Sequence, residues 1–160
     1  MATLIAVLAL LLATPAAAPP AETLPRPAEA TALPVADAPA VLARAHLAVF
    51  GHLPSAARLA MATAQVRLEG LALPGRNLGA IHAVRGQPWA RLGRSHRLRW
   101  FASYDDAARA YWGLLRARCR GALHAMNSGD PAEVARRLRR CAWYRAPEAW
   151  YRDGLRALRR

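Results

Sequence analysis

The sequence predicts an α+β fold that is predominantly helical, with a small β region between two helical parts. Segments free of breakers, with apolar residues at helical spacing, lie in the first and last thirds of the predicted domain. Between them, from Asn77, short apolar runs are interrupted by "RGQP" and "LGRS", a pattern typical of short strands and turns. Leu98 and Trp100 alternate there with Arg97 and Arg99. The chain of 160 residues is long enough for one domain with its own core.

The N-terminal part is predicted to be an export signal followed by a tether. Residues 4–13 form an uninterrupted apolar run of signal-peptide length, too short for a comfortable membrane span. We therefore expect a signal peptide over residues 1–18 and export to the periplasm or the extracellular space; a buried N-terminal helix is the alternative. Residues 19–39 are rich in Ala and Pro and predict an extended tether, because they cannot bury enough apolar surface to offset ordering. The domain is expected over residues 40–160.

The first predicted helix with a chemical candidate runs from Ser55, an N-cap, to Gly70, a natural C-cap. It is apolar nearly all round, so it is expected to be buried. Glu69 lies at its end, where the helix dipole and apolar surroundings both disfavour a charged carboxylate and should raise its pKa. A carboxyl that keeps its proton can protonate a departing glycosidic oxygen. The alternative is a glutamate that reaches water or pairs with an arginine.

Two consecutive helices are predicted in the last third, over residues 103–126 and 130–141. Cys119 and Cys141 lie on their core-facing stripes, so in an oxidising compartment a disulfide between them is favoured over two buried thiols. The cysteine spacing fits no metal motif, and we expect no metal and no cofactor. The expected capping residues are Ser103 with Asp106 in the first helix and Asp130 in the second.

The formal net charge is +13, which predicts attraction to polyanions such as the anionic polymers of a cell wall. "RRLRR", residues 136–140, resembles a nucleic-acid patch. It falls on the solvent face of an amphipathic helix, however, and the signal-like leader also argues against a nucleic-acid partner.

Four segments resemble, in order, the glucosaminidase domains of bacterial autolysins, glycoside hydrolase family 73 of the lysozyme-like superfamily (mannosyl-glycoprotein endo-β-N-acetylglucosaminidase-like). "AQVRLEG" is similar to the family's "AQ-x-x-LE-[ST]-G", and "NLGAIHA" to its "N-[LF]-[FG]-x-I-K-A". "RWFASYDDAARAYWGLLRA" resembles the stretch that leads into the large second-half helix, and "WYRAPEAWYRDGLRAL" resembles the family's "Y-Y-x-A-P-E-A-x-Y" ending.

The resemblance implies a lysozyme-like fold and cleavage of N-acetylglucosaminyl linkages in the glycan of peptidoglycan. It makes Glu69 the general acid. It places Tyr144 in the cleft, in support of the transition state, and Tyr151 and Asn77 among the substrate-binding residues. The implied partners are peptidoglycan glycan strands and anionic envelope polymers. We expect a monomer without a membrane span once the leader is removed.

Two departures from the family leave a second interpretation open. The family's Gly-Trp-Gly after the glutamate is absent, since the chain continues as "GLALPGR". No second catalytic carboxylate stands out, because the other acids of the domain's second half fit helix starts; these acids are Asp105, Asp106, Glu148 and Asp153. A single acid implies assistance by the substrate's N-acetyl group, an unidentified second acid, or lost activity. The alternative function is a catalytically inactive, cationic wall-binding module.

Aromatic residues are the remaining candidates for contacts with sugar. Trp89 and Trp100, in the β region, are candidates for stacking on sugar rings, with core packing as an equal alternative. Tyr111 and Trp112 are expected in the core because they lie on a helix with Leu115. The histidines have no spacing for a metal or a catalytic triad and are expected at the surface or behind the site; they include His46, His52, His96 and His124.

Overall fold

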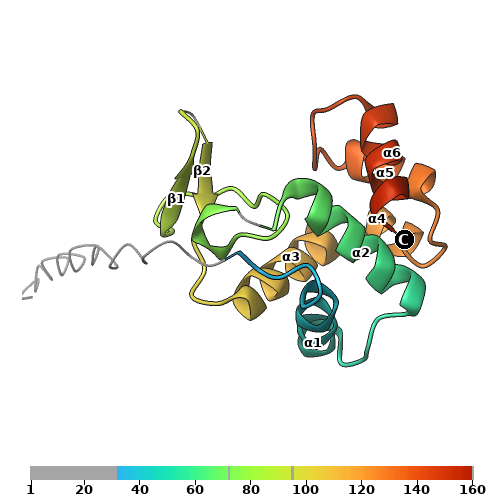
Figure 1. Ribbon diagram of the computed structural model, residues 1–160, viewed down its shortest axis with the longest axis horizontal. Helices are drawn as coiled ribbons and strands as arrows, with labels where there is room; N and C mark the ends of the chain where they lie inside the picture. Colours follow the sequence, from blue (N-terminus) through green and yellow to red (C-terminus); the bar gives the residue numbers. More distant parts are fainter. Residues whose placement is uncertain (1–31, 72, 95, 160) are drawn as a thin grey trace, which may run out of the picture.

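Most of the described chain is helical, and one small hairpin interrupts the helices. The computed structural model describes residues 32–71, 73–94 and 96–159. Six α-helices and a two-stranded antiparallel sheet occur in these residues, which confirms the predominantly helical α+β prediction (Figure 1). The elements are α1 (Ala38–Phe50), α2 (Ala56–Glu69), the 3-10 turn η1 (Pro74–Arg76), β1 (Trp89–Leu92), β2 (His96–Arg99), α3 (Tyr104–Arg118), α4 (Arg120–Ala125), α5 (Pro131–Arg140) and α6 (Glu148–Leu158).

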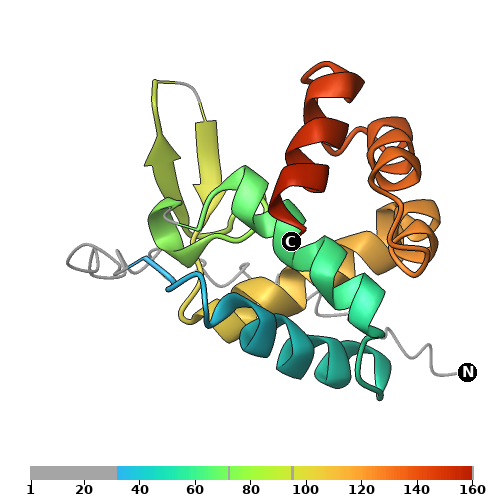
Figure 2. The same cartoon turned by 45° about the vertical axis from the view of Figure 1, so that its right-hand side comes forward.

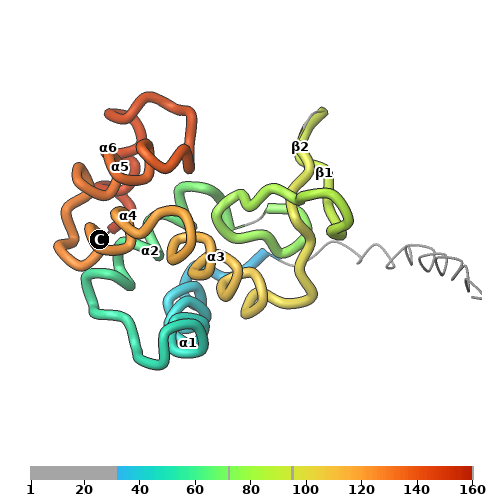
Figure 3. The backbone as a smooth tube through the Cα atoms, turned by 180° about the vertical axis from the view of Figure 1, so that it is seen from behind, coloured from blue at the N-terminus to red at the C-terminus, as the bar shows by residue number. Residues whose placement is uncertain are grey.

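The hairpin and the C-terminal helices lie on opposite sides of α2 and α3 (Figure 2). Helix α1 packs on α3, α2 packs on α6, and α5 contacts both α4 and α6. The view from behind shows the same separation of β1 and β2 from α4, α5 and α6 (Figure 3). Because α2 lies between the hairpin and the C-terminal helices, a residue at its C-terminal end can contact side chains from either of these parts.

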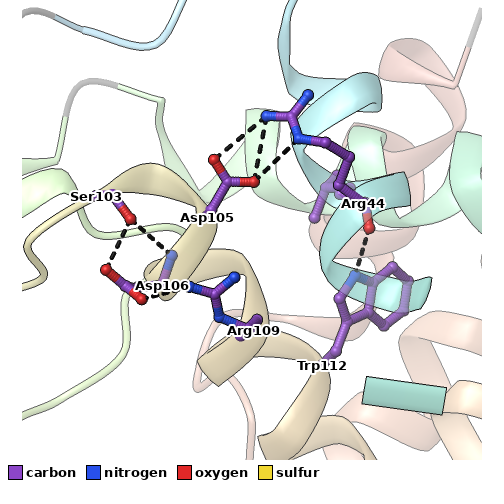
Figure 4. A network of polar contacts seen from close by, with 7 residues as sticks. Arg44, Ser103, Asp105, Asp106, Arg109 and Trp112 are labelled. Atoms are coloured by element: carbon purple, nitrogen blue, oxygen red, sulfur yellow. Dashed lines mark hydrogen bonds and ion pairs between the residues drawn. The ribbon is translucent and has the colours of Figure 1, made fainter. Parts of the chain in front are cut away.

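The core joins α1 to α3. Tyr111 and Trp112 are fully buried on α3, which confirms their predicted place in the core. The indole N–H of Trp112 donates to the backbone oxygen of Leu42 at 2.9 Å, so the largest core side chain has its polar atom satisfied by α1 (Figure 4).

One histidine expected near the surface is instead completely buried. His46 lies between Phe50 and Trp112, with ring centroids 4.4 and 4.9 Å away. Its Nδ1 lies 2.8 Å from the His52 carbonyl and its Nε2 2.9 Å from Arg58 Nη1. Since a carbonyl only accepts and a guanidinium only donates, Nδ1 carries the proton and Nε2 accepts, which is the neutral imidazole. Burial, the largest cause, lowers the pKa of His46.

Side-chain caps begin the helices where the sequence predicts them. Ser55 accepts from the Arg58 N–H at 3.2 Å, Ser103 from the Asp106 N–H at 3.1 Å, and Asp130 from the Ala132 N–H at 2.9 Å. Gly70 ends α2 with a φ of 106°, a backbone conformation that residues with a Cβ atom rarely adopt.

The predicted helix over residues 103–126 is wrong in one respect, because it is broken at Cys119. The backbone there has φ −124° and ψ 39°, which ends α3 and begins α4. The predicted disulfide between Cys119 and Cys141 is confirmed, with the two Cα atoms 5.5 Å apart. It ties the junction of α3 and α4 to the end of α5.

The hairpin pairs Trp89 with Arg99, Ala90 with Leu98, Arg91 with Arg97 and Leu92 with His96. A short segment runs along the other edge of β2, where Arg99 N–H donates to the Ile81 oxygen at 2.8 Å and Ala83 N–H to the Arg97 oxygen at 3.0 Å. Leu98 is fully buried, so one face of this small sheet lies against the protein.

The fold begins slightly earlier than residue 40. Leu33 is part of the core, and its N–H bonds the Leu71 oxygen at 3.4 Å, so residues predicted as tether contribute to the domain. The predicted signal peptide and residues 19–31 of the predicted tether lie outside the described residues. Within the described part, none of the helices has the length and apolar character to cross a bilayer.

Candidate functional site

Glu69 is the last residue of α2, and its half-buried carboxylate meets side chains from the C-terminal part of the chain. The hydroxyl of Tyr151, on α6, donates to Glu69 Oε1 at 2.6 Å. The indole of Trp143, in the loop before α6, faces the carboxylate as a second donor. The carboxylate is therefore held by two groups more than 70 positions away in the sequence.

Close packing of α6 on α2 makes this meeting possible. Gly154 lies on α6 against Leu68, so that a Cβ on Gly154 would come within 2.6 Å of Leu68 Cδ1. The missing side chain lets the helices approach closely, and Tyr151, almost one turn before Gly154, then reaches Glu69.

The pKa of Glu69 is raised above its ordinary value. Burial is the largest cause, because it disfavours the charged form. The donors Tyr151 and Trp143 act in the opposite direction, since they favour the carboxylate, but they do not outweigh burial. Glu69 therefore keeps its proton to a higher pH than an exposed glutamate does.

A buried polar side chain also lies one helical turn before Glu69 on α2. Gln65, one turn before Glu69 on α2, is fully buried, and its Oε1 accepts from the Tyr111 hydroxyl at 2.8 Å. Burial is also the largest cause that raises the pKa values of Tyr111 and Tyr151, and Glu69 adds to both shifts. Both phenols thus stay protonated and act as donors.

The two predicted cleft tyrosines have different contacts. Tyr144 stacks on Tyr151 with parallel rings 3.7 Å apart. Its own hydroxyl donates to the Ala135 oxygen at 2.9 Å, so it does not point at Glu69. Burial, with Glu148 as the second cause, raises the pKa of Tyr144 to about 12. Tyr144 therefore positions Tyr151, and Tyr151 makes the contact with the acid.

Asn77 organises the loop that follows α2 and has no polar atom left for a ligand. Its amide nitrogen donates to the backbone oxygens of Ile81 and Arg99, both at 2.8 Å, and its oxygen accepts from the Ile81 N–H at 2.8 Å. Asn77 is fully buried. A substrate-binding role for Asn77 stays a prediction, and its hydrogen bonds fix the path of residues 77–81.

The two tryptophans of the β region are not brought to Glu69 by any described contact. Trp89 is 43% exposed, and the Arg97 guanidinium lies 4.7 Å from its ring centre. Trp100 is half-buried, and a Cβ on Gly75 would lie 3.1 Å from its ring. Trp89 can meet a ligand along the hairpin, whereas Trp100 mainly packs against η1.

A cavity of about 490 Å³ lies between the hairpin side and α3. Trp143 lines it and also faces Glu69, so this indole connects the acid to the cavity. Gly79 lies close to two aromatic rings in the wall of this cavity. A Cβ at position 79 would lie 3.1 Å from Tyr111 and 3.3 Å from Trp143, so the absence of a side chain there lets the two rings approach the backbone. The sequence analysis did not single out Trp143, although it lies in the "WYRAPEAWY" segment beside the two tyrosines. A second cavity, about 520 Å³, holds the Arg44–Asp105 pair, and Glu69 itself lines neither of the two cavities.

Five other acids of the described residues, Asp105, Asp106, Asp130, Glu133 and Asp153, are engaged elsewhere. Asp105 pairs with Arg44 at 3.2 Å. The Asp106 carboxylate accepts from the hydroxyl of Ser103, the cap of α3, at 2.7 Å and bonds Arg109 at 2.6 Å (Figure 4). Glu133 and Asp153 pair with neighbouring arginines, and Asp130 caps α5. Of the described acids, none shifts the pKa of Glu69, and none of them forms a cluster with histidine or cysteine that could hold a metal.

Comparison of the chain with protein-family models, with curated proteins and with solved structures yields no match. The site therefore has to be interpreted from its own geometry.

Proposed function

We propose that the chain is an exported peptidoglycan hydrolase with a lysozyme-like arrangement, in which Glu69 is the general acid for cleavage of N-acetylglucosaminyl linkages. The observation that carries the proposal is the environment of Glu69. Its pKa is raised by burial, and it is held by Tyr151 and by Trp143, which also lines the cavity. A protonated, positioned carboxyl is what protonation of a leaving glycosidic oxygen needs.

None of the described acids contributes to the pKa shift of Glu69, and this favours assistance by the substrate over a paired carboxylate. Glu69 gives its proton to the glycosidic oxygen as the bond to the anomeric carbon breaks. The N-acetyl oxygen of the same sugar bonds that carbon and forms a cyclic oxazolinium ion. Water then attacks the anomeric carbon as its bond to the N-acetyl oxygen breaks, which restores the N-acetyl group. The water gives its proton to the Glu69 carboxylate, which restores the acid.

Three further features support the location and the target. The Cys119–Cys141 disulfide fits an oxidising compartment outside the cytosol. The net charge of +13 fits an anionic envelope. The hairpin and α4–α6 on either side of α2 fit two parts that flank a cleft (Figure 1).

The experiment compares wild type, Glu69→Gln and Glu133→Gln on purified cell-wall sacculi. Glutamine keeps an oxygen that can accept from Tyr151 but has no proton to give, so we expect clearing to fall by about 10²–10⁴-fold. Glu133→Gln is a matched control on α5, where the carboxylate only pairs with arginines. Clearing by Glu69→Gln at the wild-type rate would remove Glu69 from the mechanism.

The runner-up is a wall-binding module that keeps the cavity and the positive charge without chemistry. The lack of a second carboxylate in the surroundings of Glu69 is the observation that favours it. Wild-type protein that pellets with sacculi, and releases no reducing sugar, would establish this second function in place of hydrolysis.

A further inference from the structure

The hairpin carries positive charge with no negative charge to balance it. From Gly70 to Tyr104 the chain contains six arginines and neither Asp nor Glu. Several arginines of the helices, by contrast, have carboxylate partners, as in Arg44–Asp105, Arg109–Asp106 and Arg137–Glu133. The six arginines are Arg76, Arg85, Arg91, Arg94, Arg97 and Arg99.

The pairing of the strands concentrates three of these charges on one face. Residues directly opposite each other share a face, so Trp89, Arg91, Arg97 and Arg99 lie together. Arg91 is directly opposite Arg97, an arrangement of like charges that destabilises a sheet. None of these three arginines forms an ion pair with a described residue. We call Arg91, Arg97 and Arg99 the arginine face.

Arg91 and Arg97 lie on the outer part of the arginine face, whereas the Arg99 guanidinium packs 4.9 Å from the centre of the Phe101 ring. The opposite face holds Ala90 and Leu98, of which Leu98 is fully buried and Ala90 lies close to Gly75 of η1. Arg91 and Arg97 are exposed and Arg99 is half-buried. The charges that repel one another are therefore open to a ligand.

The arginine face is continuous with the cavity that Trp143 lines. Arg99 lines that cavity together with Ile81, its neighbour across the strand edge, and with Trp143. From Arg99 the face extends along β2 to Arg97, about 7 Å further on, and then across to Arg91. A polymer that occupies this cavity, which Glu69 does not line, can thus extend along the hairpin over these guanidinium groups.

We propose that the arginine face binds the carboxylates on the peptide stems of the glycan, and so selects stem-bearing peptidoglycan over a neutral glycan. This inference rests on the proposed function and names the substrate feature that the same site selects. Guanidinium groups pair with carboxylates in a planar, two-bond geometry, and such pairing would relieve the Arg91–Arg97 repulsion. An anionic bilayer fits less well, because Trp89 and Leu92 lie on opposite faces and present no common apolar surface.

The test measures binding by the full chain carrying Glu69→Gln, so that no substrate is consumed. The two probes are a soluble glycan tetrasaccharide with its peptide stems and N-acetylchitotetraose, which has no carboxylate. We expect tighter binding of the stem-bearing probe, with a preference that shrinks at high salt. Adding Arg91→Gln and Arg97→Gln should lower the affinity for the stem-bearing probe by roughly fivefold to tenfold and leave the affinity for N-acetylchitotetraose unchanged.

The matched control adds Arg140→Gln and Arg156→Gln, which remove the same charge from exposed positions on α5 and α6. It should keep the preference. Thermal unfolding checks folding, and Arg91→Gln alone serves if the double variant unfolds, since Arg97 also covers Trp89.

Equal affinity for the two probes, or equal losses in both double variants, would overturn the inference. Release of reducing sugar from sacculi by wild type, measured separately, shows whether the proposed hydrolysis stands. If wild type releases sugar but shows no preference for the stem-bearing probe, the proposed hydrolysis stands and the proposed role of the arginine face is refuted. If neither probe binds and wild type releases no sugar, both the proposed hydrolysis and the proposed role of the arginine face are refuted.

Discussion

Replacement of Tyr151 by phenylalanine isolates the contact that holds the acid. The phenol ring and its stacking on Tyr144 remain, and only the oxygen 2.6 Å from Glu69 Oε1 is lost. Tyr151 is 2% exposed, so water does not readily replace the missing donor. The substitution therefore tests a single hydrogen bond.

The size of the effect follows from the charge on Glu69. A hydrogen bond to a charged group contributes about 1.5–3 kcal/mol, against about 0.5–1.5 kcal/mol between neutral groups. At a pH where Glu69 is ionised, Tyr151→Phe should lower the free energy of unfolding by about 2 kcal/mol. For a domain of this size, that corresponds to a fall in Tm of roughly 6–10 °C. In the Glu69→Gln background the bond is neutral, and the loss should be about 1 kcal/mol.

The pH dependence gives the sharper readout. The Tyr151 donor lowers the pKa of Glu69, so its removal raises that pKa further. The high-pH limb of the activity profile, where the general acid loses its proton, should move to higher pH in Tyr151→Phe. The fall in Tm should also shrink at low pH, where Glu69 is protonated. Equal losses of stability at low and high pH, together with an unmoved activity limb, would refute the assignment of Tyr151 as donor to an ionising Glu69.

Three other outcomes test the surrounding structure. Because the folded-state pKa of Glu69 is raised, the folded protein holds this proton more tightly, and the free energy of unfolding should fall as pH rises from the unfolded to the folded pKa. Denaturant unfolding should show this fall in wild type and not in Glu69→Gln; identical pH profiles would contradict the burial argument. Asn77→Ala removes the Asn77 partner of the Ile81 N–H and of the Arg99 oxygen, while the Ile81 oxygen keeps the Arg99 N–H, and it should cost about 3 kcal/mol in the same assay. Asn127→Ala, at an exposed site, should cost less than about 1 kcal/mol. Cys119→Ser with Cys141→Ser removes a cross-link of 22-residue separation and should cost roughly 3 kcal/mol; a Tm equal to that of oxidised wild type would speak against a stabilising disulfide.

Local signals in the sequence were sufficient for the helix starts and for the disulfide. Ser55, Ser103 and Asp130 cap helices through atoms two or three residues away, so the sequence contains everything that decides those contacts. Helical spacing likewise put Cys119 and Cys141 on core-facing stripes of neighbouring helices.

The contacts around Glu69 depend on packing between segments that are distant in the sequence, and these contacts could not be predicted from the sequence. Periodicity predicts which face of a helix is buried but not what that face meets. The Gln65–Tyr111 bond joins residues 46 positions apart, and Trp143 reaches Glu69 only because the loop before α6 folds back. Tyr144 and Tyr151 looked equivalent in the sequence, and only their packing shows which hydroxyl faces the acid. The resemblance to glucosaminidases stays a prediction.

The contact between Glu69 and Tyr151 also has a consequence for the order of synthesis. The two residues are 82 positions apart, which at about 5–20 residues per second separates their translation by roughly 4–16 s. During that interval α2 exists without α6, so the Tyr151 hydroxyl is not there to hold the Glu69 carboxylate. The acid acquires its donors and its shifted pKa only when α6 has been made and docks. Any hydrolytic capacity thus belongs to the finished chain and not to the nascent one.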